Sequence, residues 1–264
     1  MRLLVIALIL TGSLLAVDFS TRYDVDVGMF GKVGYADVTL TERDGSYEMK
    51  VVATTTGTAA TLTGKRVETY ISGGKIVSGQ YLPDTFVRIK KTTSIERVQT
   101  YHFDHNKQEV TLEQNEEKWI TQTKFDTVSF KLIKEDVKES SSSNSVLPNY
   151  NRNDVLSAYL NTKQNCNTNQ KEYNLLAVGA HNDKKDITVS FLEGLSRTEV
   201  ASSFSKDTGN IYNLHVEPID KEDTTVDVLI AFDNDGHMKE ALLGNVFWIG
   251  EIKATRVYHQ VARN

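Results

Sequence analysis

The chain has 264 residues, of which 39% are hydrophobic and 25% charged, with a formal net charge of −5 at pH 7 and one cysteine. This balance excludes a polytopic membrane protein and a wholly disordered chain. The acidic surplus argues against a nucleic-acid binder, which would carry a basic face. A single cysteine excludes an internal disulfide framework and any multi-cysteine zinc or iron–sulfur site, and no cofactor is predicted.

Residues 1–16 predict a secretory signal peptide. Arg2 supplies a short positive region, residues 3–10 form an unbroken apolar run, and Ala16 is a small residue at a cleavage position. The apolar run is shorter than the roughly 20 residues that span a bilayer, although an uncleaved anchor stays open as an alternative. We therefore expect an exported protein that begins near Val17 and has no later membrane span. The lack of cysteine pairs favours the bacterial periplasm.

After the signal peptide, apolar residues recur at every second position. This alternation gives each strand one apolar face and one wet face, which is typical of an antiparallel sheet. We expect residues 17–264 to form a single, mainly β domain: a large curved antiparallel sheet, half-barrel or barrel-like, with one or two short helices. The clearest strand segments are residues 47–51, 128–132, 187–191 and 226–232.

Polar turn sequences separate the predicted strands. Asp-Gly pairs at residues 44–45 and 235–236 are the strongest short hairpin signal. Residues 104–107 predict a third hairpin, and the glycine pair at residues 73–74 predicts a fourth.

Two segments depart from the strand pattern. Residues 138–149 are polar and rich in serine, which predicts a flexible loop. Apolar residues at helical spacing, after Asn153 or Asp154 as the cap, predict a helix over residues 153–162. A second short helix is expected at residues 198–204. A helix in the middle of the chain could plug a curved sheet, and a sheet with so little helix could leave a cavity for apolar ligands.

Residue patterns that could carry chemistry are weak. His102, Asp104 and His105 could hold a metal ion, but Asp104 is better explained as a turn residue. Cys166 lies in a polar stretch and is interpreted as a free thiol. There is no nucleophile elbow, phosphate-binding glycine loop or zinc-binding helix motif. We therefore expect a protein that is not an enzyme, with a hydrolase whose site is assembled in space as the remaining alternative.

Short motifs in a fixed order carry a resemblance to a known family. The chain resembles the bacterial exported proteins grouped as domain of unknown function 3108. The resemblance implies an exported, largely β protein without an established activity, similar to the half-barrel periplasmic carriers that shuttle lipoproteins between membranes. It implies no catalytic residues. The motifs are Tyr23–Val27, Gly31–Gly34, Leu82–Asp84, Tyr101–Asp104, Asn153–Tyr159, Phe232–Gly236 and Glu251–Ala254.

These observations lead to two hypotheses of function. In the first, an apolar cavity of the curved sheet binds a lipid or another amphipathic component of the cell envelope. In the second, the protein is an envelope scaffold that binds a protein partner through a sheet edge or the serine-rich segment. The residues predicted to line the cavity, for which plain core packing is the other interpretation, are Phe130, Leu132, Val189, Phe191, Val228, Ile230, Phe232 and Trp248.

Overall fold

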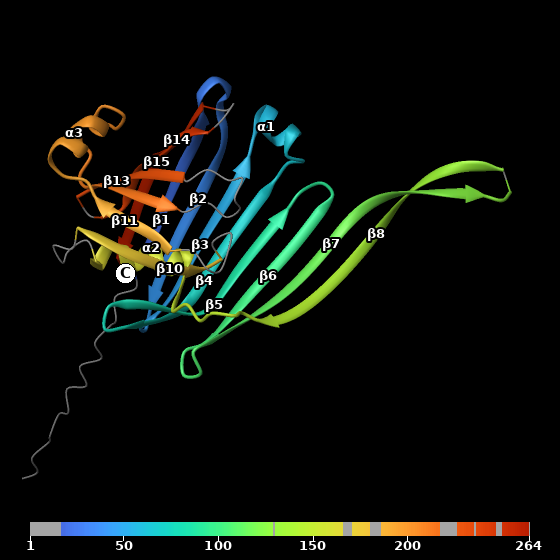
Figure 1. Ribbon diagram of the computed structural model, residues 1–264, viewed down its shortest axis with the longest axis horizontal. Helices are drawn as coiled ribbons and strands as arrows, with labels where there is room; N and C mark the ends of the chain where they lie inside the picture. Colours follow the sequence, from blue (N-terminus) through green and yellow to red (C-terminus); the bar gives the residue numbers. More distant parts are fainter. Residues whose placement is uncertain are drawn as a thin grey trace, which may run out of the picture.

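The computed structural model describes residues 17–128, 130–165, 171–179, 186–216, 226–234, 236–246 and 250–263. The predicted signal peptide, Cys166 and Trp248 lie outside these ranges. Within them, fifteen strands form one strongly curved sheet (Figure 1). None of the helices in the described part of the chain is long and apolar enough to cross a membrane.

The N-terminal half of the chain is a series of antiparallel strands in which each pairs with the next along the chain. A short 3-10 helix, η1 (Gly28–Phe30), joins the first two strands, and α1 (Gly57–Leu62) joins the third to the fourth. The strands are β1 (Val17–Val27), β2 (Gly31–Arg43), β3 (Ser46–Thr55), β4 (Val67–Val77), β5 (Gln80–Lys91), β6 (Ile95–Asp104), β7 (Glu109–Asp126) and β8 (Lys131–Val146).

The C-terminal half continues the same sheet from its other side. Its last strand pairs along the whole of β1, so that the sheet runs in the order β8 to β1 and then from the last strand back to the two-residue β9. Only β9 and its neighbour are parallel among the described strand pairs. The elements are β9 (Asn153–Asp154), α2 (Val155–Asn165), β10 (Glu172–Val178), β11 (Asp186–Phe191), α3 (Gly194–Ala201), β12 (Ile211–Val216), β13 (Val226–Phe232), β14 (Met238–Val246) and β15 (Gly250–Arg263).

The sheet coils until its C-terminal edge meets the inner face of β5 without closing. Val178 at the end of β10 and Phe86 of β5 are both fully buried in one cluster. Gly179 follows with a φ of 86°, and a Cβ there would lie 2.3 Å from a ring carbon of Phe86, so only glycine permits this approach. Because β5 and β10 are not hydrogen-bonded neighbours, the sheet is an open half-barrel, and the predicted mainly β, antiparallel fold is confirmed.

Helix α2 lies inside the curve and covers apolar residues of both the N-terminal and the C-terminal strands of the sheet. Leu160 belongs to the cluster formed by β1, β2 and β3, and Leu156 packs against both that cluster and the one around Phe86. On the other side, Tyr159 packs against the cluster of β10 to β13. The expectation that a mid-chain helix plugs the sheet is confirmed.

A buried polar network anchors the start of α2. The Asp154 side chain accepts hydrogen bonds from the backbone nitrogens of Leu156 at 2.7 Å and Ser157 at 3.1 Å, as a helix cap does. Its other oxygen accepts a 2.6 Å bond from the hydroxyl of Ser72 in β4, which is itself bonded to the Tyr47 hydroxyl at 2.9 Å. Burial raises the pKa of Asp154 despite these donors. The predicted cap is confirmed, and it also ties the helix to the sheet.

The serine-rich segment is not the predicted loop. Residues 138–146 belong to β8 and pair with β7, with Ser140 opposite Glu117 and Ser143 opposite Gln114. Both faces of this ribbon are wet, so its strands need no apolar residues, and the long partner strand supplies the backbone hydrogen bonds. The loop was predicted because a polar segment has no side chains to bury in a core. That argument does not exclude a strand whose two faces are both exposed to solvent.

The glycine pair at residues 73–74 is not a hairpin. It lies inside β4, where the register against β5 shifts by one residue opposite Pro83. A Cβ on Gly74 would lie 2.1 Å from the carbonyl oxygen of Leu82, so the pair serves a β-bulge. The chain turns instead at Ser78 and Gly79, which both have positive φ.

Other local predictions have mixed outcomes. The hairpin turn at residues 44–45, the hairpin connection between β13 and β14 and the turn after β6 are confirmed, and Asp235 of the second Asp-Gly pair lies outside the described residues. The helix predicted at residues 198–204 begins four residues earlier, as α3, and α1 was not expected. Residues 128–132 are not one strand, because Val128 and Phe130 lie in turns and Phe130 has a φ of 54°.

Beyond the body, β7 and β8 continue alone as a two-stranded ribbon (Figure 1). Strand β6 pairs with β7 only as far as Lys118, whereas β7 and β8 remain paired to Asp126 and Lys131. We call residues 119–128 and 130–138 the arm. It projects away from α2 and the C-terminal strands.

Candidate functional site

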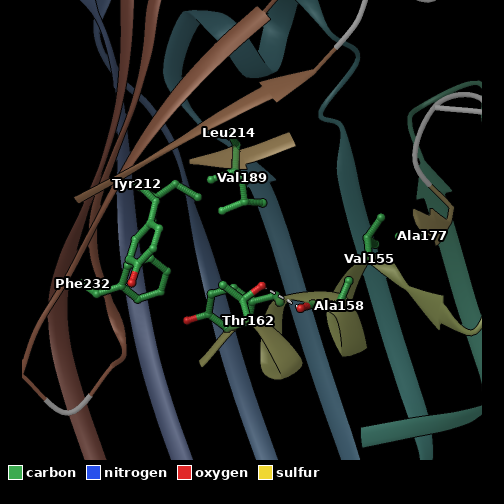
Figure 2. Close-up of a pocket in the computed structure, with 10 residues that line it drawn as sticks. Val155, Ala158, Thr162, Ala177, Val189, Tyr212, Leu214 and Phe232 are labelled. Carbon is green, nitrogen blue, oxygen red and sulfur yellow. Dashed lines mark hydrogen bonds between the residues drawn. The ribbon is translucent and has the colours of Figure 1, made fainter. Parts of the chain in front are cut away.

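An apolar cavity of about 90 Å³ lies between α2 and the strands that face it (Figure 2). The helix lines it with residues spaced by three and four positions, which places them on one face. The strands line it with alternate residues, such as Ile230 and Phe232 of β13, which share one face of the sheet. The lining residues are Val155, Ala158, Tyr159, Thr162, Ala177, Val189, Tyr212, Leu214, Ile230 and Phe232.

Aromatic rings form one wall of the cavity. The ring of Phe232 stacks on Tyr159, with centroids 6.4 Å apart, and meets Tyr212 edge-on at 5.5 Å. Phe191 packs against Tyr212 from the next strand, with centroids 5.2 Å apart. Figure 2 shows Tyr212 and Phe232 together on one side, with Val189 and Leu214 near each other on the sheet.

The polar groups of Thr162 and Tyr159 in the lining already form hydrogen bonds within the protein. Thr162 donates its hydroxyl hydrogen bond to the Ala158 carbonyl oxygen at 2.9 Å, one turn back in the helix (Figure 2). The Tyr159 hydroxyl accepts a 3.3 Å bond from the backbone nitrogen of Met238, and burial raises the pKa of this phenol. None of the ten lining residues is a carboxylate, histidine, lysine, arginine, serine or cysteine. The cavity can therefore bind an apolar group, but its lining offers no general acid–base pair or activated nucleophile.

The size of the cavity limits what it can hold in this conformation. Ordinary ligand pockets measure roughly 300–1,000 Å³, several times the volume found here. The cavity accommodates the end of a hydrocarbon chain or a similarly small apolar group. A whole acyl chain would require α2 to move away from the strands.

The residues predicted to line a cavity fall into three groups. Val189, Ile230 and Phe232 line the cavity, and Phe191 and Val228 pack in the same cluster. The prediction is wrong for two residues, because Phe130 is 78% and Leu132 72% exposed at the far end of the arm. Trp248 lies outside the described residues. Ligand binding by the three lining residues stays a prediction.

Several lining residues were missed by sequence reasoning. The predicted helix contains Val155, Ala158, Tyr159 and Thr162, whose spacing already marks one face, so the signal was present. Alternation could likewise have found Tyr212 and Leu214 on β12. No local sequence pattern shows that the helix face and the strand face lie opposite each other across the curved sheet.

His105, just after β6, has a structural role, whereas the side chain of His102 in β6 is exposed. The Nδ1 of His105 lies 2.6 Å from the Tyr150 hydroxyl, and its Nε2 lies 2.7 Å from the Pro83 carbonyl oxygen. Asp104 accepts hydrogen bonds from the backbone nitrogens of residues 106 and 107, and these bonds lower its pKa. Across the described part of the chain, no three His, Cys, Asp or Glu side chains are grouped as metal ligands.

A second hollow, of about 270 Å³, lies on the ribbon of β7 and β8 near the body. It is polar, with Glu116, Lys118, Glu139, Ser140 and Ser141 around it. Lys118 and Glu139 form an ion pair at 3.2 Å, and Glu116 is paired with an arginine of β6. These charges are half-buried and already paired with an opposite charge, so the hollow is explained as a polar surface with its charges neutralised.

Comparisons with known proteins assign this chain to no family. No family model matches the chain, and no curated protein matches it. One similar solved structure is a beta-barrel-like protein of domain of unknown function DUF1849 from Brucella abortus, with 12% sequence identity and a TM-score of 0.45. The similarity covers 93% of this chain and 98% of that one. Membership of the 3108 family stays a prediction.

Proposed function

We propose that this protein is a non-enzymatic binding protein of the bacterial cell envelope that holds the apolar end of an amphipathic molecule, such as a lipid, in the cavity under α2. The observation that carries the proposal is the apolar cavity between a buried helix and the sheet that curls around it. Hydrocarbon that fills the cavity would gain van der Waals contacts with the ten lining residues and would leave water.

The lining predicts which part of the ligand enters. The ten residues carry no charge, so a charged headgroup would remain outside. Each buried methylene contributes about 0.8 kcal/mol, and a Kd of 1 mM already requires about 4 kcal/mol. A chain end that fills only the present volume therefore binds weakly, and tighter binding requires α2 and the strands to separate.

Ligand binding is tested first by organic extraction of the purified protein and mass spectrometry of the extract. Dodecanoic acid is then titrated into the extracted protein while the methyl NMR signals of Val189, Leu214 and Ile230 are followed. We expect a co-purifying amphiphile and saturable shifts of these methyl signals. Absence of both would overturn the proposal.

A variant that fills the cavity sharpens this test. Ala158 is buried and lines the cavity, so Ala158→Phe should abolish the shifts caused by dodecanoic acid. The exposed Ala201 at the end of α3 provides the matched control, and Ala201→Phe should leave the shifts unchanged. Equal loss in both variants would point to general damage to the fold and count against the site.

We also infer that residues 1–16 direct export to the periplasm, since Arg2, the apolar run and Ala16 have the order of a signal peptide. N-terminal sequencing of the protein from fractionated bacterial cells tests this inference. We expect a periplasmic protein that begins near Val17. A chain that keeps its first residues and stays with the membrane fraction would contradict it.

A second candidate function rests on the outer edge of β8. This strand ends the sheet order, and no strand in the described ranges pairs with its outer edge. Such an edge can bind an extended peptide by strand addition. An envelope protein captured by the wild type, and lost when Ser141→Lys and Ser143→Lys are combined, would favour this function over the cavity.

A further inference from the structure

The far end of the arm exposes a group of apolar side chains. Phe125 is 52%, Val128 89%, Phe130 78% and Leu132 72% exposed. Exposed ends of hairpins are usually polar, because apolar groups there risk aggregation, so a grouped apolar tip indicates an interaction site. We call residues 124–128 and 130–134 the arm tip.

Apart from Ile133, which pairs with Lys124 on the other face of the ribbon, the apolar residues of the arm tip lie together. Phe125 pairs directly with Leu132 across the two strands, so their side chains share one face of the ribbon. The rings of Phe125 and Phe130 meet edge-on, with centroids 6.2 Å apart. The three side chains therefore form one continuous apolar surface at the end of the arm, and Val128 extends it into the turn.

Basic residues surround this surface. The arm tip carries Lys124, Lys131 and Lys134 against one acid, Asp126, which gives a local charge of +2 in a chain whose formal net charge is −5. All three lysines are exposed. By strand alternation, Lys134 shares the face of Leu132, whereas Lys124 and Lys131 lie on the opposite face. The acids Glu135 and Asp136 lie further back along the arm.

We propose that the arm tip docks the protein on the surface of an anionic lipid bilayer. Interfacial binding requires apolar side chains that enter the boundary between headgroups and acyl chains, together with basic groups at the phosphates. The arm tip supplies both. Lysines on both faces of the ribbon suit a plane that is met end-on, whereas a protein partner would be expected to contact one face.

The length of the arm fits this role. From Trp119 to Asp126 the ribbon extends roughly 25 Å beyond the last residue paired to β6, at about 3.4 Å per residue. Figure 1 shows the arm leaving the body on the side away from α2. Docking by the tip would keep the cavity clear of the bilayer. The proposal does not depend on a ligand in that cavity.

Vesicle flotation tests the proposal. The purified protein is mixed with vesicles of phosphatidylcholine alone or of phosphatidylcholine with phosphatidylglycerol. We expect flotation with the mixed vesicles, weaker flotation with phosphatidylcholine alone, and a loss of binding as salt is raised. No flotation with the anionic vesicles at low salt would overturn the proposal.

Two sets of variants separate the apolar and basic contributions. Val128→Ser combined with Phe130→Ser, which removes apolar area without changing the charge, should lower partitioning onto anionic vesicles at least tenfold. Lys124→Gln, Lys131→Gln and Lys134→Gln together should lower it by on the order of 100-fold, at about fivefold per lysine, and leave the weak binding to phosphatidylcholine unchanged. Because these side chains are exposed, the melting temperature should not change.

Matched controls come from outside the arm tip. Leu195 of α3 is as exposed as the tip residues, and Leu195→Ser should float like the wild type. Lys138 lies at the base of the arm, and Lys138→Gln should also have no effect. A loss of flotation in these controls equal to that of the tip variants would contradict the proposal. So would tip-dependent capture of an envelope protein without vesicle binding.

The cavity variant Ala158→Phe should bind vesicles normally. This result distinguishes a failure of the docking proposal from a failure of the proposed ligand binding in the cavity.

Discussion

The body and the arm are both antiparallel sheet, but they are stabilised in different ways. In the body, strands such as β2 bury one face, with Val38 and Leu40 packed in the cluster that also contains Leu160 of α2. In the arm, β8 has an exposed or half-exposed side chain at every position. Burial against a helix stabilises the body, whereas only backbone pairing and surface contacts stabilise the arm.

This difference predicts a one-way dependence between the two regions. An isolated two-stranded hairpin is marginally stable in water, and exposed ion pairs such as Lys138–Glu117 contribute about 0–1 kcal/mol each. The arm therefore relies on strands β7 and β8 being held where they leave the body. The stability of the body, by contrast, does not depend on the arm.

The largest expected effect is a truncation in the body. Phe86 is fully buried beside Gly179, so Phe86→Ala should lower the free energy of unfolding by about 3–5 kcal/mol. The same truncation in the arm, Phe125→Ala, should change it by less than about 0.5 kcal/mol. Urea denaturation of both variants measures the difference. Similar losses would show that the arm is part of the core.

A smaller effect is expected from the anchor of α2. Asp154→Ala removes the helix cap and leaves the donors of Ser72 and Ser157 without their acceptor, at a cost of about 1–3 kcal/mol. Asp154→Asn keeps an acceptor oxygen and should cost less. Thermal unfolding compares the two variants, and equal losses would mean that the hydrogen bonds do not matter.

The same residue predicts a pH dependence. Burial raises the pKa of Asp154 in the folded protein above its unfolded value of about 3.9. The folded state then binds the proton more tightly, so the contribution of Asp154 to stability declines as pH rises from the unfolded pKa to the folded one. Unfolding free energies of wild type and Asp154→Asn, measured across that window, should converge at its acidic end if the carboxyl is responsible.

Glu68 of β4 should show a weaker effect of opposite sign. Burial alone would raise its pKa, but hydrogen bonds from Tyr70 and Arg66 outweigh burial and lower it. Its contribution to stability is present above the unfolded pKa of about 4.3 and is lost as pH falls through the folded pKa. Glu68→Gln should remove this loss of stability at low pH, whereas Glu117→Gln, at an exposed position of β7 just before the arm, should leave it intact.

The smallest effect is expected from removing the arm itself. Replacing residues 119–138 by Asn-Gly, a preferred hairpin turn, should leave the free energy of unfolding within about 0.5 kcal/mol of the wild type. Circular dichroism and urea denaturation measure the result. A shortened chain that cannot fold would contradict the one-way dependence.

Features that depend on neighbouring residues could be predicted from the sequence alone. The Asp-Gly turn at residues 44–45, the turn made by Asp104 and the helix cap at Asp154 all rest on contacts within three residues. Alternating apolar residues on β13 likewise predicted one face of a half-buried strand. These features could be predicted because the residues that stabilise them are close to one another in the sequence.

Only the tertiary structure decided which faces are covered. The serine-rich segment became a strand because β7 is long enough to pair with it. Phe130 and Leu132 stayed exposed because the ribbon of β7 and β8 extends beyond Lys118, the last residue paired to β6, so that nothing in the body covers them. The cavity exists because α2 and β11 to β13 meet across a sheet joined by β1 and β15, at opposite ends of the chain. Burial is a property of what lies opposite a residue, and local sequence does not encode that neighbour.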